Sequence, residues 1–247
     1  MKTVAIIGLG TMGSAIARSL GGSYAVIGLD QGDDLGRAQA ADIVIIAVKP
    51  QSFEELSQSL RPHVENQTVL SIMAGVGVGQ VAERLGAKHV FRLMPNLGLA
   101  KAKSLTAVYQ LDSSNRENNR QEIDKLLSLW GGVVWLQKEA DFNAFTALAG
   151  SGPAYFFELT AQLQQAAEQL GFDEELARQI ANSTLASAAA MLDGSGESAA
   201  EKARQVASQG GTTEAALNVF AKHDFAGIVL AAARAAANRS KELSGGH

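Results

Sequence analysis

The chain has 247 residues, 47% of them hydrophobic and 19% charged, which is typical of a globular protein with one large domain or two smaller ones. Its net charge of −4 and its pI near 5.6 exclude the basic field that nucleic-acid and anionic-membrane binding usually use, so we expect neither partner. The absence of cysteine excludes disulfides and thiolate metal sites, and we expect a cytoplasmic protein without a bound metal.

The first half of the chain alternates short β-branched runs with amphipathic segments. Near-continuous apolar strands are typical of a parallel sheet that is buried on both faces. Residues 51–60 and 78–85 have the pattern of crossover helices, so residues 1–137 are predicted to form a doubly wound α/β domain. The runs that predict strands are TVAIIG (3–8), YAVIGL (24–29), DIVIIAV (42–48), TVLSIM (68–73), HVFRLM (89–94), LTAVYQ (105–110) and GVVWLQ (132–137).

A glycine-rich turn follows the first strand. The stretch VAIIGLGTMGSAIARSL places Gly8, Gly10 and Gly13 between this strand and a helix, which is the spacing G-x-G-x-x-G in its expected context. Gly8 would permit the tight turn, Gly10 would let a pyrophosphate approach the backbone, and Gly13 would let the helix pack closely on the strand. We therefore predict a Rossmann-like dinucleotide site, with Thr11 and Met12 at the helix N-terminus facing the phosphates.

The second strand ends at Asp30, 17 residues after Gly13. An acid in this place usually accepts a hydrogen bond from the ribose 2′-hydroxyl and disfavours a 2′-phosphate, which indicates NADH. Arg37 could pair with a 2′-phosphate if the following loop folds back, which would indicate NADPH. The cofactor is therefore predicted to be NADPH or NADH.

The segment after Asp30 is unusually short, because only the 11 residues 31–41 separate it from the next strand at Asp42. A doubly wound fold normally places a helix, an edge strand and another helix there, and a βαβ crossover alone needs about a dozen residues or more. We therefore expect the edge helix and strand to be missing and the adenine side of the cofactor pocket to be shallow.

Further candidates follow the later strands at their carboxyl ends, the edge where open α/β sheets bind ligands. The third strand ends with Lys49 and Pro50 beside the expected topological switch point, although the proline could simply end the strand and leave Lys49 solvated. The stretches SIMAG and MPN end two more strands and are predicted to line a nicotinamide pocket. The predicted cofactor contacts from these strand ends are Ala47, Val48, Lys49, Pro50, Ala74, Gly75 and Met94, and Asn96 is a predicted substrate contact.

The strand pattern ends near residue 139, and alanine-rich segments of helical character follow. Glycines punctuate these segments, as helix stops do. Residues 138–247 are therefore predicted to form an all-α domain. Its helices are expected over residues 141–149, 154–170, 174–192, 198–207, 213–222 and 224–241.

The helical half is interrupted at SQGGTT, residues 208–213. Gly210 and Gly211 can turn the backbone so that successive amides converge, and Thr212 and Thr213 add hydroxyl groups at the start of the next helix. A helix N-terminus with free amides is suited to binding a carboxylate. Threonine is also a common helix cap and glycine a common helix stop, so the residues alone favour a structural role over a carboxylate site.

Six stretches resemble the pyrroline-5-carboxylate reductase family in their order and spacing: GLGTMGSAI, IAVKPQ, SIMAGV, RLMPN, ALAGSGPAYFF and ASQGGTTEAAL. The resemblance covers nearly the whole chain. It implies reduction of a cyclic imino acid, 1-pyrroline-5-carboxylate, to L-proline with NAD(P)H. It also implies an N-terminal dinucleotide-binding domain and a C-terminal domain that forms a homodimer, in many members within a ring of dimers.

The same resemblance assigns roles within the interrupted segment. It implies that Thr213 approaches the imine nitrogen and donates or relays the proton, and that in a dimer this loop serves a cofactor held by the partner chain. The residues that it implies for substrate binding are Ser208, Gly210, Gly211, Thr212 and Thr213.

The absence of a recognisable catalytic base is consistent with imine reduction. The reaction needs a hydride donor, a proton and a carboxylate anchor, whereas oxidation of a hydroxyl needs a positioned base. Phe156 occupies the position where sugar-acid dehydrogenases of related shape carry a lysine. None of the four histidines lies in a recognisable catalytic context: His63, His89, His223 and His247.

Three positions depart from the family pattern. Leu97 and Gly98 replace a threonine and a proline that usually follow MPN, and Gln209 replaces a proline before the paired glycines. A reductase of a six-membered cyclic imine acid is therefore one alternative. A non-catalytic dinucleotide-binding protein is another, because the adenine side is shortened.

Overall fold

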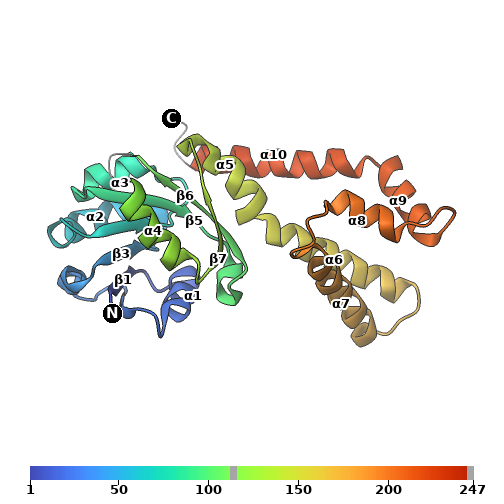
Figure 1. The fold of residues 1–247 in the computed structure, drawn as a ribbon, viewed down its shortest axis with the longest axis horizontal. Helices are drawn as coiled ribbons and strands as arrows, with labels where there is room; N and C mark the ends of the chain where they lie inside the picture. The colour runs from blue at the N-terminus through green and yellow to red at the C-terminus, as the bar shows by residue number, and fades with distance from the viewer. Residues whose placement is uncertain (112–115, 244–247) are drawn as a thin grey trace. The chain divides into compact units, whose positions relative to one another are not determined.

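The computed structural model describes residues 1–111 and 116–243, and within them seven strands form one sheet in the order β2-β1-β3-β4-β5-β6-β7 (Figure 1). Each strand coincides with one of the seven apolar runs of the sequence, so this part of the prediction is confirmed. The strands are β1 (Thr3–Ile7), β2 (Ala25–Leu29), β3 (Ile43–Ile46), β4 (Thr68–Ser71), β5 (His89–Met94), β6 (Ser104–Gln110) and β7 (Gly131–Trp135).

Both faces of this sheet are buried under helices, as continuous apolar strands require. On β1, Val4 and Ile6 pack into a core cluster with side chains of α1 and α4, while Ala5 and Ile7 pack into a second cluster with side chains of α2 and α3. The four helices are α1 (Thr11–Leu20), α2 (Phe53–Leu60), α3 (Val78–Leu85) and α4 (Arg116–Leu127) (Figure 1). Short 3₁₀ turns over Pro50–Ser52 and Arg61–His63 flank α2.

The prediction of a parallel sheet is wrong for its last two strands. Strands β1 to β5 pair in parallel, but β5 and β6 are antiparallel, with Met94 opposite Ala107, and β7 is parallel to β6. The connection from β5 to β6 contains a single 3₁₀ turn, Leu97–Lys101, and is too short for a βαβ crossover. The chain therefore reverses at this point, and α4 provides the next crossover.

The sheet ends at β2, as the short segment after Asp30 predicts. Residues 30–42 are all described, and they form one 3₁₀ helix, Leu35–Ala40, but no strand beyond β2. Ala38 anchors this helix, since it is fully buried in the cluster with α2 and α3. The predicted loss of the edge helix and strand is confirmed.

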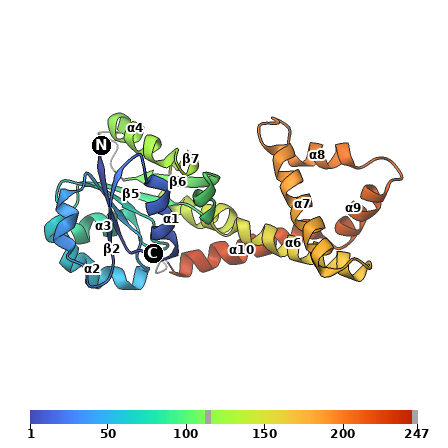
Figure 2. The same cartoon turned by 90° about the horizontal axis from the view of Figure 1, so that it is seen from below.

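The second half of the chain is helical, as predicted, with one difference at its start (Figure 2). The helix expected over 141–149 is instead a 3₁₀ turn (Glu139–Asp141), a short α-helix α5 (Phe142–Phe145) and a π-helical turn (Thr146–Gly150). The remaining helices are α6 (Gly152–Gln169), α7 (Glu174–Leu192), α8 (Ala199–Val206), α9 (Thr212–Lys222) and α10 (Phe225–Leu243).

The described chain divides into two compact units. One is Met1–Gly150 together with the end of α10 from Ala235, and the other is Ser151–Arg234. In the first unit, the hydroxyl of Ser240 on α10 donates to Oδ1 of Asn143 on α5, at 2.9 Å. The functional boundary predicted between residues 137 and 138 stays a prediction.

Candidate active site

The glycine turn joins β1 to α1 in a conformation that restricts two of its three glycines. Gly8 has φ +97°, and a Cβ there would lie 2.9 Å from Cγ1 of Val48 and 3.0 Å from the carbonyl of Ala47. A Cβ on Gly13 would lie 1.9 Å from the carbonyl oxygen of Gly8. At Gly10, in contrast, no described atom beyond its two chain neighbours lies within 4 Å of the Cβ position. Two glycines are therefore required by packing, whereas Gly10 faces open space that a ligand can fill.

The N-terminus of α1 opens onto the same space. Gly10 is the N-cap and supplies no side chain to the first amides, and the fully described first turn contains no acidic residue. The amides of Thr11, Met12 and Gly13 precede the first intrahelical bond, which Ser14 donates to the carbonyl of Gly10. Free amides and the positive end of the helix dipole suit a pyrophosphate at this position.

The end of β3 lies directly beside this turn. Strands β1 and β3 are neighbours, and the chain leaves β1 towards β2 on one side and returns to β3 on the other, which defines the switch point. The amide of Ala47 donates to the carbonyl of Ile7 at 2.8 Å. Residues 47–50 are thus held at the switch point, with the side chain of Lys49 exposed.

The ends of β4 and β5 reach the same edge of the sheet. Ala74 is exposed and Gly75 has φ +81°, so the turn after β4 presents backbone to solvent. Met94 is only 7% exposed and packs with Phe142. A Cβ on Gly150 would lie 3.9 Å from the sulfur of Met94, so this side chain already has close protein neighbours.

Asn96 connects the strand end to the π-helical turn. Its Nδ2 donates to the carbonyl of Ala149 at 2.8 Å, and its Oδ1 accepts from the amide of Gly98 at 2.9 Å. Its own amide donates to the hydroxyl of Ser104 at 3.1 Å. The side chain therefore holds two loops together, and its predicted contact with substrate stays a prediction.

An ion pair behind these loops was not predicted from the sequence. Arg92 on β5 is 6% exposed, and its Nη1 lies 3.0 Å from Oε1 of Glu139, which also accepts from the amide of Val78 at 2.7 Å. The guanidinium carbon lies 4.5 Å from the ring centre of Phe142. Glu139 thus joins the start of α3 to β5. A charged residue inside the apolar run HVFRLM was the available signal.

Glu139→Ala is expected to lower the free energy of unfolding by about 2 kcal/mol, because it leaves a buried guanidinium without its counter-charge. The cost is below that of a fully buried pair because the Glu139 side chain is 27% exposed. Urea denaturation measures the change. Glu54→Ala, which breaks the surface pair with Arg84, is the matched control and should leave the midpoint nearly unchanged. Equal shifts of the urea midpoint in both variants would contradict a stabilising role for the buried pair of Arg92 and Glu139.

The segment 208–213 forms the entry to α9 in the helical unit. Gly210 has φ +71°, the amide of Gly211 donates to the carbonyl of Ser208 at 2.9 Å, and Gly211 is the N-cap. The first amides of α9, those of Thr212, Thr213 and Glu214, precede its first intrahelical bond. The predicted helix stop is therefore present, and it leaves a helix N-terminus free for an anion.

The role of Glu214 was likewise not predicted from the sequence. Its Oε2 accepts from the amide of Gly210 at 2.7 Å, which fixes the turn from the helix side. An acid at the third position of a helix is a known signal for such a contact. The bond also engages the amide of Gly210, one of the amides predicted to converge on a carboxylate of the substrate.

The structure brings the predicted cofactor residues and Asn96 to one edge of the sheet, in loops, at the start of α1 and at the end of β5. The predicted residues of segment 208–213 belong to the other unit. Of the histidines, His63 has Nδ1 2.9 Å from Nε2 of Gln39, and His247 lies outside the described residues. In the described ranges, no three His, Cys, Asp or Glu side chains gather as metal ligands, and no single helix is long and apolar enough to cross a membrane.

A mostly parallel sheet with a glycine turn at its switch point, next to a free helix N-terminus, defines a dinucleotide-binding protein. Comparisons with known proteins indicate which family of dinucleotide-binding proteins the chain is similar to. A family model described as pyrroline-5-carboxylate reductase dimerisation matches residues 139–243. A second model, described as NADP oxidoreductase coenzyme F420-dependent, matches residues 23–75.

Curated relatives cover most of the chain. A pyrroline-5-carboxylate reductase of Pseudomonas aeruginosa is 37% identical over 209 residues, which is 83% of this chain and 75% of the relative. Pyrroline-5-carboxylate reductase 2 of Bacillus subtilis is 34% identical over 203 residues, covering 82% and 72%. The solved structure of a pyrroline-5-carboxylate reductase from Coxiella burnetii has a TM-score of 0.89 at 28% identity, covering 98% of both chains. The chain belongs to the pyrroline-5-carboxylate reductase family.

Proposed function

We propose that this protein reduces 1-pyrroline-5-carboxylate to L-proline with NADH or NADPH. The observation that carries the proposal is the similarity to pyrroline-5-carboxylate reductases over 83% of the chain, at 37% identity. The geometry adds what this activity needs: open space at Gly10 for a pyrophosphate and a free helix N-terminus at α9 for a carboxylate.

The dinucleotide would lie across the carboxyl edge of the sheet. The amides of Thr11 and Met12 would bind the pyrophosphate, and the backbone of Ala74 and Gly75 would border the nicotinamide. When bound, the nicotinamide supplies the hydride to the C=N carbon. Lys49 is exposed at the switch point and would place a positive charge near the phosphates.

The substrate would be held by its carboxylate at the start of α9. The amides of Thr212, Thr213 and Glu214 would bind the carboxylate oxygens, and the hydroxyl of Thr213 would deliver or relay the proton to the imine nitrogen. Thr213 is half-buried, whereas Thr212 is exposed, so Thr213 is the better shielded of the two hydroxyls. Glu214 keeps its carboxylate on the amide of Gly210, which holds the loop in place.

The dimerisation domain over residues 139–243 implies a homodimer. Large apolar side chains of this region are exposed in the single chain, among them Phe156 (59%), Phe157 (67%) and Ile228 (59%), and a partner chain would bury such surface. We extend the proposal to a ring of dimers in the cytoplasm, in which the loop 208–213 of one protomer serves the cofactor of its partner.

Turnover of five-membered and six-membered cyclic imine acids tests the proposed substrate. Leu97 is 57% exposed after the end of β5 and is the departure from the family pattern that could change the ring that is bound. We expect a higher kcat/KM for pyrroline-5-carboxylate. Equal or better rates on the larger ring would favour the alternative substrate, and dinucleotide binding without any turnover would favour a non-catalytic protein.

A further inference from the structure

The loop that follows the edge strand β2 borders the adenosine half of the proposed dinucleotide site. In a fold with a glycine turn after β1, the adenosine ribose lies beside the end of β2. No described strand covers β2 on its outer side, and the fully described residues 30–42 form a loop and one 3₁₀ helix. Residues 30–42 are therefore the segment that would contact the ribose 2′-position.

The carboxylates of this loop bind its own backbone amides. Oδ2 of Asp33 accepts from the amide of Asp30 at 2.8 Å, and Oδ1 of Asp30 accepts from the amide of Gln31 at 2.9 Å. Oδ1 of Asp34 accepts from the amide of Gly36, also at 2.9 Å. Backbone amides of such a turn are the donors that a 2′-phosphate would need. Here the amides of Asp30, Gln31 and Gly36 are engaged, each by a carboxylate.

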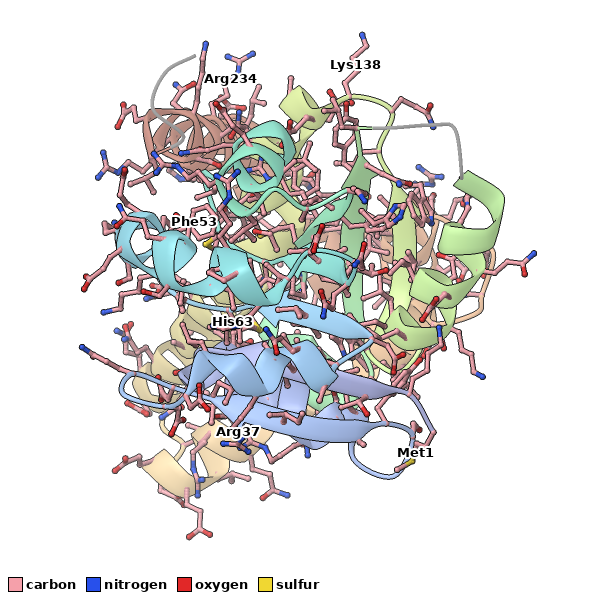
Figure 3. All side chains as sticks on the ribbon, turned by 90° about the vertical axis from the view of Figure 1, so that its left-hand side faces the viewer. Met1, Arg37, Phe53, His63, Lys138 and Arg234 are labelled. Atoms are coloured by element: carbon pink, nitrogen blue, oxygen red, sulfur yellow. The ribbon has the colours of Figure 1, made fainter. Side chains whose placement is uncertain are left out.

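The positive charge available to a phosphate is small. Residues 30–42 contain four aspartates and a single basic residue, Arg37. Arg37 is exposed on the 3₁₀ helix after the loop (Figure 3). Its backbone amide donates to the carbonyl of Asp34 at 3.3 Å, which places the arginine directly after the acidic turn. One solvated guanidinium has to offset the three carboxylates of the turn before it can attract a phosphate.

We propose that this turn, through Asp30, Asp33 and Asp34, makes the protein select NADH over NADPH. The inference rests on the proposed function, because it assumes that the glycine turn binds a dinucleotide. Oδ1 of Asp30 holds the Gln31 amide and fixes the carboxylate, and Oδ2 accepts from the ribose 2′-hydroxyl of NADH. The 2′-phosphate of NADPH would meet three carboxylates in this turn and find three of its amides already engaged by them.

Binding of NADH and NADPH to the full-length protein, measured separately by isothermal titration calorimetry, tests this selection without turnover. We expect NADH to bind at least about tenfold more tightly at low salt, and the difference to shrink at higher ionic strength because the carboxylates are exposed. The variant Asp33→Asn/Asp34→Asn leaves Asp30 in place and keeps, at each changed position, one oxygen that can accept from the backbone amide. It should tighten NADPH binding about tenfold and change NADH binding much less.

Asp42→Asn is the matched control for the loss of an acidic charge. Oδ2 of Asp42 accepts from the amide of Thr3, at the amino end of β1 and far along the strand from the glycine turn. We expect this variant to keep the wild-type preference. NADPH binding as tight as NADH, or an equal shift in the Asp42 variant, would overturn the inference. If neither dinucleotide bound, the proposed function itself would fail.

Discussion

Thr213→Ala is expected to lower kcat for imine reduction by about 10- to 1,000-fold, since the variant loses the group that we propose transfers the proton. The fold should tolerate the change, because no side chain caps the N-terminus of α9 and the turn is held by Glu214 on the amide of Gly210. Steady-state kinetics at saturating dinucleotide measures the effect.

Thr213→Ser is the matched variant, because it keeps the hydroxyl and removes only the methyl group. Its kcat should stay within a few-fold of the wild type, and both variants should unfold at the same urea concentration. Unchanged turnover in Thr213→Ala would remove this hydroxyl from the mechanism and leave segment 208–213 with the role of a helix stop alone.

Gly10→Ala is expected to weaken dinucleotide binding by about 10- to 100-fold, which corresponds to roughly 1.4–2.7 kcal/mol. Gly10 has φ −63°, which alanine adopts without strain, and its Cβ would meet no described atom of the protein within 4 Å. The new methyl group would instead occupy the space in which we place the pyrophosphate. The dissociation constant should therefore rise while the free energy of unfolding stays unchanged.

Gly79→Ala provides the control for Gly10→Ala. Gly79 lies in α3, its Cβ would also meet no described atom within 4 Å, and alanine should stabilise the helix by about 0.5–1 kcal/mol. Dinucleotide binding by this variant should match the wild type. If Gly10→Ala bound the dinucleotide equally well, the glycine turn would not be the pyrophosphate site.

Features that depend on local sequence could be predicted. The seven strands follow from apolar runs with clear ends, and the missing edge strand follows from chain length, because 11 residues between Asp30 and Asp42 cannot form a helix, a strand and a second helix. The helix stop at Gly210 and Gly211 follows from glycine chemistry. Each of these conclusions needs only neighbouring residues and standard geometry.

Features that depend on distant partners could not be predicted. The direction of β6 depends on where its chain returns, since its apolar pattern is the same in either direction. The bond from Asn96 to Ala149 and the pair of Arg92 with Glu139 join residues 53 and 47 positions apart in the sequence. A single sequence does not indicate which residues so far apart come into contact. The sequence predicts that Asn96 and Met94 contact ligands, but it does not show that both side chains also contact other parts of the protein.

The π-helical turn at Thr146–Gly150 is a third feature of this kind. The sequence predicts one helix over residues 141–149, whereas the structure has a π-helical turn in which the carbonyl of Ala149 accepts from Asn96. The partner of this turn is thus a side chain from a distant loop, which the local sequence does not indicate. The sequence GSGP that follows begins α6 with a proline in its first turn, as the proline position suggests.

The most direct test of the proposed activity is steady-state oxidation of NADH by the purified protein with pyrroline-5-carboxylate, with proline quantified in the same sample. We expect one proline for each NADH oxidised, with a kcat in the usual enzyme range of about 1–10³ s⁻¹. NADPH in place of NADH should support the same reaction less efficiently. If neither dinucleotide were oxidised with this substrate and no proline formed, the proposed function would be wrong.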